Sequence, residues 1–279
     1  MNHRIGFMQG RFSPLVGERI QSFPWAYWRD EFVAAEECRF TLMEWTLDQE
    51  RLCDNPLLTA AGQEEIRQLC RKYGITIASL TGDCFMQTPC WKASGAERMS
   101  LLQDFRSVAS ACSAVGIGLM VIPLVDNGQI SNRAEEDVLV GSFADEAELL
   151  GELDVRVAFE SDFDAPELSR LLDRLGPSMF GVNYDIGNSA SLGMNPIEEI
   201  AAYGHRIVNV HVKDRLLGGP TVALGTGNAD FDAVFESLAR AGYEGNYILQ
   251  TARARYDRHA EVLSNYRDML AEWILRHGA

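Results

Sequence analysis

Short apolar runs alternate with longer amphipathic segments along the whole chain. Runs such as residues 155–160 and 180–185 are almost continuously apolar, as expected of parallel strands that are buried on both faces. They are too short to be buried helices, which usually exceed ten residues. The pattern therefore predicts eight strands, at residues 4–8, 41–45, 76–80, 119–123, 155–160, 180–185, 207–212 and 247–250.

Apolar residues recur at helical spacing between these runs. The predicted helices cover residues 28–37, 60–73, 95–115, 133–153, 165–175, 196–203, 231–241 and 259–276. Eight strictly alternating strands and helices predict a single-domain (β/α)8 TIM barrel over residues 1–279. An open doubly wound sheet is the alternative, and it is disfavoured because no G-x-G-x-x-G motif follows the first strand.

The composition of the chain disfavours some classes of binding partner. The chain has 25 Lys and Arg against 40 Asp and Glu, a net charge of −15, which disfavours binding to nucleic acid or to an anionic membrane surface. Its six cysteines form no C-x-x-C pair and no apolar run reaches the roughly 18 residues of a membrane span. The chain enters a strand-like segment at His3 without a signal-peptide pattern, so we expect a cytoplasmic protein.

Four consecutive predicted strands lead to a residue that can bind a metal, namely Glu160, Asp185, His211 and Gln250. Catalytic groups of TIM barrels lie at these carboxyl ends. An unpaired carboxylate buried there would cost several kcal/mol, which a shared divalent cation would offset. Three oxygen ligands and one imidazole favour Mn²⁺, with Mg²⁺, Co²⁺ or Zn²⁺ as alternatives. Hydrogen bonds from loop backbone are the competing explanation for each polar strand end.

Further motifs follow the same strand ends. They are residues 6–14 (GFMQGRFSP), 44–45 (EW), 185–188 (DIGN), 211–214 (HVKD), 225–231 (GTGNADF) and 242–245 (GYEG), together with Glu160. In this combination the sequence resembles, over essentially the whole chain, the xylose isomerase-like TIM-barrel superfamily, and within it the sugar phosphate isomerase/epimerase branch that includes ketose 3-epimerases.

The resemblance implies a divalent-metal-dependent isomerase or epimerase that acts on a sugar or sugar phosphate through an enediolate, with Glu160 as the base. It also implies a second catalytic glutamate at the end of the eighth strand, where this chain has Gln250. An amide accepts no proton at neutral pH, so the two-glutamate mechanism cannot be transferred unchanged. One base suffices for a 1,2-isomerisation or for dehydration of a keto-sugar or keto-inositol. A sugar-binding barrel without catalysis is the third alternative.

Seven residues near the predicted barrel mouth are candidates for substrate binding: Gln9, Arg11, Glu44, Trp45, Asn188, Lys213 and Arg215. All of them except Gln9 also have a structural interpretation. Arg11 could tie down the loop that follows it, Glu44 could anchor a loop, and Asn188 could cap a turn. The two cations near His211 suit a phosphate group, or they could form ion pairs with Asp214 or neighbouring acids. Exposed apolar residues at the barrel rim are compatible with a homo-oligomer.

Overall fold

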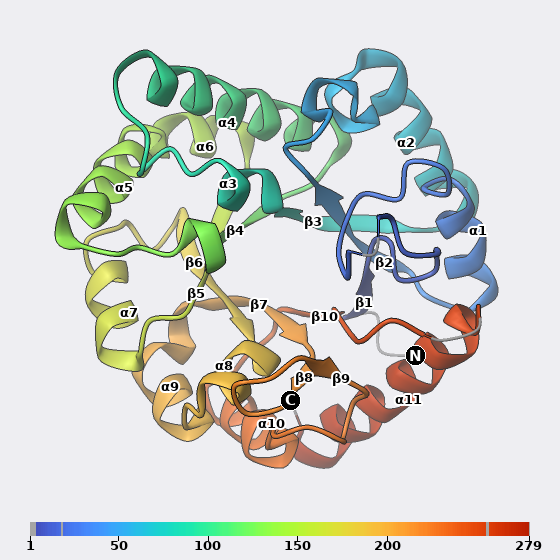
Figure 1. Cartoon of the computed structure of the whole chain (residues 1–279). Helices are drawn as coiled ribbons and strands as arrows, with labels where there is room; N and C mark the ends of the chain where they lie inside the picture. Colours follow the sequence, from blue (N-terminus) through green and yellow to red (C-terminus); the bar gives the residue numbers. More distant parts are fainter. Residues whose placement is uncertain (1–3, 18, 255–256, 279) are drawn as a thin grey trace.

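The protein is a closed barrel of eight parallel strands in the order β1-β10-β7-β6-β5-β4-β3-β2. Its structure, a computed structural model, describes residues 4–17, 19–254 and 257–278, so His3 lies outside the described residues. Figure 1 shows the strands as an inner ring with helices around it. This confirms the predicted TIM barrel. The strands are β1 (Ile5–Met8), β2 (Leu42–Leu47), β3 (Thr76–Gly82), β4 (Leu119–Leu124), β5 (Arg156–Ser161), β6 (Phe180–Asp185), β7 (Ile207–Val212) and β10 (Asn246–Leu249).

Local signals set the helix ends. At the start of α2, the Thr59 side chain accepts a hydrogen bond from the backbone of Gly62, and the helix ends at Gly74 with a positive φ of 63°. The larger helices are α1 (Asp30–Glu37), α2 (Ala60–Tyr73), α4 (Gly95–Val115), α5 (Arg133–Asp145), α6 (Ala147–Leu153), α7 (Ala165–Leu172), α9 (Pro196–Tyr203), α10 (Phe231–Arg240) and α11 (His259–His277).

The helix predicted over residues 133–153 is in fact two helices, α5 and α6, separated at Glu146. The Glu146 side chain is buried and accepts two hydrogen bonds from Arg106 Nε and one from Arg106 Nη2. This contact joins the α5–α6 junction to Arg106 of α4. Apolar periodicity continues across the break, so the pattern alone did not reveal it.

The sequence pattern did not predict α3 (Asp83–Gln87), α8 (Ile186–Leu192) or the antiparallel pair β8 (Asp214–Arg215) and β9 (Thr221–Val222). They follow β3, β6 and β7 directly, so they lie on the carboxyl side of the barrel. Figure 1 shows them inside the ring of outer helices. They bring additional side chains to the mouth of the barrel.

Side chains alternate between the two faces of each strand. In β2, Glu44 contacts residues of β3 and β7 inside the barrel. The next residue, Trp45, is fully buried outside it, with ring centroids 5.4 Å from Phe23 and 5.8 Å from Trp28. The apolar core therefore lies between the strands and the helices. Among the described residues, no helix is long and apolar enough to cross a membrane.

Candidate metal centre

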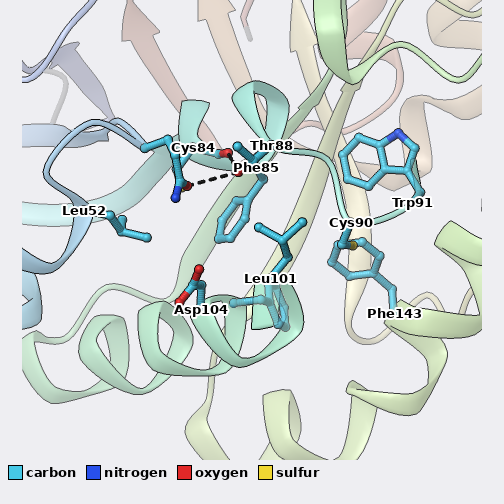
Figure 2. A pocket seen from close by; sticks show the side chains of 11 residues that line it. Leu52, Cys84, Phe85, Thr88, Cys90, Trp91, Leu101, Asp104 and Phe143 are labelled. Atoms are coloured by element: carbon cyan, nitrogen blue, oxygen red, sulfur yellow. Dashed lines mark hydrogen bonds between the residues drawn. The ribbon is translucent and has the colours of Figure 1, made fainter. Parts of the chain in front are cut away.

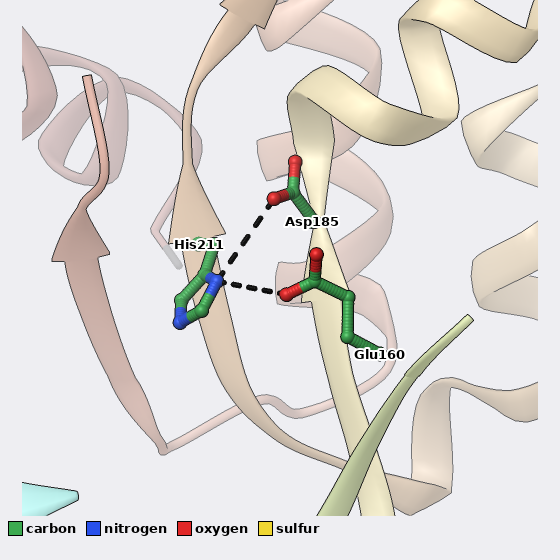
Figure 3. Close-up of side chains that lie close together, drawn as sticks. All are labelled: Glu160, Asp185 and His211. Carbon is green, nitrogen blue, oxygen red and sulfur yellow. Dashed lines mark ion pairs between the residues drawn. The ribbon is translucent and has the colours of Figure 1, made fainter. Parts of the chain in front are cut away.

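Three side chains from adjacent strands meet inside the barrel. Glu160 of β5, Asp185 of β6 and His211 of β7 are all buried, and each offers a ligand atom within 4.8 Å of the other two. The β6–β7 register places Asp185 directly beside His211. His211 Nδ1 lies 3.0 Å from Glu160 Oε2 and 3.9 Å from Asp185 Oδ2, as Figure 3 shows.

The contact of the other imidazole nitrogen determines where His211 carries its proton. His211 Nε2 lies 2.7 Å from Glu44 Oε1. The Glu44 carboxylate is fully buried and also accepts hydrogen bonds from Ser79, Thr81 and Asn209. Because a carboxylate only accepts, the neutral imidazole carries its proton on Nε2 and directs the Nδ1 lone pair toward Glu160 and Asp185. When the imidazole is protonated, Nδ1 also carries a hydrogen, which faces Glu160 Oε2 at 3.0 Å.

Both carboxylates are held in position by neighbouring amides. Glu160 accepts hydrogen bonds from Asn183 Nδ2 at 2.8 Å and from Asn188 Nδ2 at 2.7 Å. Asp185 Oδ1 accepts from the backbone of Asn188 and thereby caps α8. Asp185 Oδ2 lies 2.6 Å from Lys213 Nζ. These contacts leave one oxygen of each carboxylate directed toward His211 Nδ1.

The electrostatics of this group favour a cation. Burial lowers the pKa of His211, but the charges and hydrogen bonds of Glu44 and Glu160 outweigh burial and raise this pKa to about 10. Burial raises the pKa of Asp185. For Glu160, burial is outweighed mainly by the hydrogen bond and charge of His211, and its pKa falls. A divalent cation could replace the proton of His211, and these two carboxylates and one imidazole nitrogen fit such an ion.

Gln250, predicted as the fourth ligand, follows β10 and lies beside this group. Its Oε1, the atom that could bind a metal, accepts a hydrogen bond from Lys213 Nζ at 2.8 Å. Its Nε2 donates to Gln21 Oε1 at 2.7 Å. Lys213 therefore contacts both Gln250 and Asp185. Its ammonium group holds the Gln250 oxygen next to the three clustered side chains.

Two of the substrate-binding candidates, Asn188 and Arg215, are connected with Glu160 by hydrogen bonds. Arg215 donates through Nη1 to Asn188 Oδ1, and its Nε and Nη2 donate to the backbone oxygen of Gly219. Asn188 in turn donates to Glu160. A chain of contacts therefore connects Arg215 with Glu160 through Asn188.

The candidates of the first strand lie just beyond its end. Gln9 Oε1 accepts from the backbone of Thr46, whereas its buried Nε2 has no partner among the described residues. Arg11 donates to the backbone oxygen of Ile20, and its Nε has no partner in this part of the chain. Arg11 thus ties down the loop, as one of the two interpretations predicted, and both side chains retain a free donor.

Glu44 and Trp45 contact other parts of the protein. Glu44 uses both oxygens to hold His211 and the side chains of β3 and β7. Trp45 lies on the opposite face of β2, and its Nε1 donates to Asn55 Oδ1. The structure therefore does not bring the Trp45 ring to the cluster, and Glu44 contacts the cluster from the side of His211 Nε2.

Sequence reasoning missed Asn183 and Asn209, although a signal for them was present. Asn183 stands two residues before Asp185, and Asn209 two residues before His211, so each pair shares one face of its strand. Asn209 donates to both Glu44 and Asn183. Polar residues repeated at a spacing of two in an otherwise apolar strand would have indicated this network.

Replacing Glu44 by Gln should weaken Mn²⁺ binding by about 10- to 100-fold, the usual effect of losing the carboxylate that orients a metal-bound histidine. The Gln amide cannot accept from His211 Nε2, Ser79 and Thr81 as a carboxylate does. Titration calorimetry with Mn²⁺ measures the change. An unchanged affinity would show that Glu44 does not position His211.

Comparison with known proteins supports the fold and identifies the family. The profile of the family described as "xylose isomerase-like TIM barrel" matches residues 32–273. An inosose dehydratase of Geobacillus thermodenitrificans (strain NG80-2) is 24% identical over 156 residues, 48% of this chain and 52% of the relative. The chain thus spans about half the length of that relative. An L-ribulose-5-phosphate 3-epimerase of Escherichia coli (strain K12) is 25% identical over 213 residues, 74% of this chain and 75% of the relative.

A solved structure with the same fold carries a metal. It is the IOLI protein with a bound zinc atom, which has a TM-score of 0.77 and 13% sequence identity, covering 98% of this chain and 99% of that one. At this identity the likeness shows the fold alone. The family profile, by contrast, covers most of the chain. The chain belongs to the xylose isomerase-like TIM-barrel family.

Proposed function

We propose that this protein is a divalent-metal-dependent isomerase or epimerase of a sugar or sugar phosphate, with Glu160 as the base. The observation that carries the proposal is the position of Glu160. Its carboxylate is buried, is oriented by two amides, and has an oxygen 3.0 Å from His211 Nδ1. The same carboxylate can therefore bind the metal and reach a substrate that binds there.

The clustered residues have different roles in proton transfer and metal binding. Glu160 removes the proton from the carbon beside the substrate carbonyl, and Asn183 and Asn188 keep its oxygens aimed. Asp185 and His211 complete the metal site, in which Gln250 is the proposed fourth ligand. When bound, the metal polarises the carbonyl and stabilises the negative charge of the enediolate. Mn²⁺ is the proposed ion, and Mg²⁺, Co²⁺ and Zn²⁺ suit the same ligands.

The neighbouring polar side chains are the proposed substrate contacts. Gln9 and Arg11 have buried donors that no described residue accepts from, which suits sugar hydroxyl groups. Lys213 and Arg215 supply positive charge beside Glu160 and Asp185, where a phosphate group could bind. Asn188 connects Arg215 with the base. We assign Glu44 and Trp45 a structural role and not a substrate contact, because their polar atoms form hydrogen bonds within the protein.

Dehydration of a keto-sugar or keto-inositol is the second candidate function. It is favoured by one specific observation, the amide Gln250, which leaves one carboxylate base where two are expected. Removal of water after one proton abstraction needs only one strategically placed base. Similarity to inosose dehydratases supports the same reading. A product with enone or diketone absorbance would distinguish it from isomerisation.

The test is incubation of the Mn²⁺-loaded protein in D₂O with a panel of substrates, followed by NMR. The panel contains ketoses, aldoses, their phosphates and an inosose. Deuterium at the carbon beside the carbonyl establishes proton abstraction, and its position separates 1,2-isomerisation from 3-epimerisation. Sugar binding without exchange or any product would instead favour a binding protein that lacks catalysis.

Replacing Gln250 by Glu should tighten Mn²⁺ binding by about tenfold, because a carboxylate adds charge beside the metal ligands. The new carboxylate would also face Lys213, which already contacts position 250. We expect increased 3-epimerase activity, because a second base becomes available. Calorimetry and the same NMR assay measure the two effects. Weaker Mn²⁺ binding would place residue 250 outside the metal site.

A further inference from the structure

Epimerisation moves a proton from one face of a carbon to the other, so the proposed function leaves a second acid/base group to be found. Three nearby groups are unsuitable. Gln250 is an amide. Both oxygens of Glu44 are taken by hydrogen bonds beneath His211. The ammonium group of Lys213 is held between Asp185 and Gln250.

We infer that Asp83 is the second acid/base group and exchanges a proton with the substrate on the face opposite Glu160. This inference rests on the proposed function. Asp83 is the first residue of α3 and directly follows β3. In the closed ring, three strands separate β3 from the β7 strand of His211 in either direction, and β4 separates it from the β5 strand of Glu160. Asp83 therefore reaches the mouth of the barrel across from His211 and from a different side than Glu160.

A chain of amides connects Asp83 with the metal centre. Lys213 donates to Gln250, Gln250 donates to Gln21 at 2.7 Å, and Gln21 Nε2 donates to Asp83 Oδ2 at 2.6 Å. Each amide thus uses its oxygen toward Lys213 and its nitrogen toward Asp83. The chain spans the mouth and fixes Asp83 Oδ2. Asp83 Oδ1 accepts no hydrogen bond from the described residues, and it is the oxygen available to a substrate.

The residues after Asp83 hold it in place. Cys84 and Phe85 line a small apolar pocket together with Leu101 of α4 and Phe143 of α5, as Figure 2 shows. A Cβ atom at Gly82 would lie 2.5 Å from the ring of Phe85, so the chain passes closely over this pocket. The apolar side of α3 is therefore anchored, and the carboxylate at its start is only 6% exposed.

The surroundings of Asp83 allow it to hold or release a proton near neutral pH. Burial is the main cause that raises its pKa, and the charges of Asp48 and Glu160 add to this, whereas Gln21 and His211 oppose it; the result is about 7. The charge of Arg11 also interacts with Asp83. Asp48 is itself bonded to Ser22, the backbone of Phe23 and Gln87, so it remains a fixed neighbour.

Every proton in the proposed epimerisation step is accounted for. The carbon–hydrogen bond beside the carbonyl breaks, its proton moves to Glu160, and its electron pair enters the enediolate. The carboxylic acid of Asp83 then gives its proton to the opposite face of the same carbon, where a new carbon–hydrogen bond forms. Glu160 is left protonated and Asp83 ionised, and both return to their starting forms by exchange with water.

The test compares wild type with Asp83→Asn at saturating Mn²⁺ in D₂O, with D-fructose, D-tagatose, L-ribulose and L-ribulose 5-phosphate as probes. In the variant, epimer formation should fall by at least about 100-fold, whereas deuterium exchange into the starting sugar should stay within about threefold. Exchange without product arises because Glu160 still removes and returns the proton on its own face. Mn²⁺ affinity, measured by calorimetry, should not change, because Asp83 is not a metal ligand.

Asp162→Asn is the matched control. Asp162 is a half-buried acid whose pKa burial raises to about 6, but it follows Glu160 on the β5 side. It should keep both exchange and product within about threefold of wild type. The inference is overturned if Asp83→Asn retains product, if it loses exchange as well, or if Asp162→Asn alone shows exchange without product. Absence of exchange in the wild type across the panel would overturn the proposed function, and the inference with it.

Discussion

Replacing Glu160 by Gln should lower proton exchange at the substrate carbon by about 10²- to 10⁴-fold, the usual contribution of a positioned general base. The variant keeps the size and the hydrogen-bonding shape of the side chain but cannot accept a proton. Asn183 and Asn188 both donate to this carboxylate, so an amide would leave one of these donors facing another donor. The loss therefore combines a missing base with a less well-oriented side chain.

The measurement is the rate of deuterium uptake at saturating Mn²⁺, so that weaker metal binding does not mimic loss of the base. Glu199→Gln is the matched control. Glu199 is also a buried glutamate, but its oxygens accept from the hydroxyl groups of Tyr184, Ser189 and Tyr203. Its substitution should leave exchange within about threefold of wild type. An unchanged rate in Glu160→Gln would show that another group is the base.

The barrel could be predicted from the sequence because its strands are short, apolar and buried on both faces. Two of the predicted strands, Phe180–Asp185 and Ile207–Val212, have the predicted bounds. Periodicity did not reveal the break at Glu146, because the apolar pattern continues across it; Glu146 there contacts Arg106 of a different helix, which sequence spacing does not show. It also did not reveal α3, α8 and the β8–β9 pair, which are too short to show a helical or strand period.

The candidate site was predictable to the extent that it lies on strands. Glu160, Asp185 and His211 are at or near the ends of three adjacent strands, so fold and sequence together place them near one another. The contacts of Lys213 could not be predicted from the sequence. The sequence suggested Asp214 as the ion-pair partner of Lys213, but the ammonium group of Lys213 contacts Asp185 and Gln250 instead. A partner of this kind depends on the direction of a loop, which sequence spacing does not determine.

The role of Asp83 depends even more on tertiary structure. Its amide partner Gln21 belongs to the long loop before α1, 62 positions earlier in the chain. No periodic pattern marks Gln21, and Asp83 follows a strand that we predicted to end three residues earlier. The extra length of β3 and the start of α3 together bring this acid to the mouth. Only the structure could show this combination.

Replacing His211 by Ala should weaken Mn²⁺ binding by at least about 100-fold, more than the loss of a residue that only orients a ligand. In the metal-free protein it should also lower the free energy of unfolding by about 3 to 5 kcal/mol. Glu44 and Glu160 are buried, and the protonated imidazole between them is the cation that balances their charge. Its removal leaves buried carboxylates without that partner.

The double variant His211→Ala/Glu44→Gln separates these two effects. Because it removes the buried charge of Glu44 together with its partner, it should recover part of the lost stability without recovering metal affinity. Calorimetry and urea unfolding measure the two quantities. If His211→Ala binds Mn²⁺ as tightly as wild type, the metal centre lies elsewhere.

The pH dependence of metal-free unfolding provides an independent check. The pKa of His211 rises from an ordinary 6.5 to about 10 in the folded protein. Its protonated form therefore stabilises the fold fully below pH 6.5, and this stabilisation is lost as the pH rises toward 10. Wild type should lose stability over this window more steeply than His211→Ala. Equal slopes would show that the proton on His211 does not balance the buried carboxylates, and that a different group supplies the positive charge that a metal would replace.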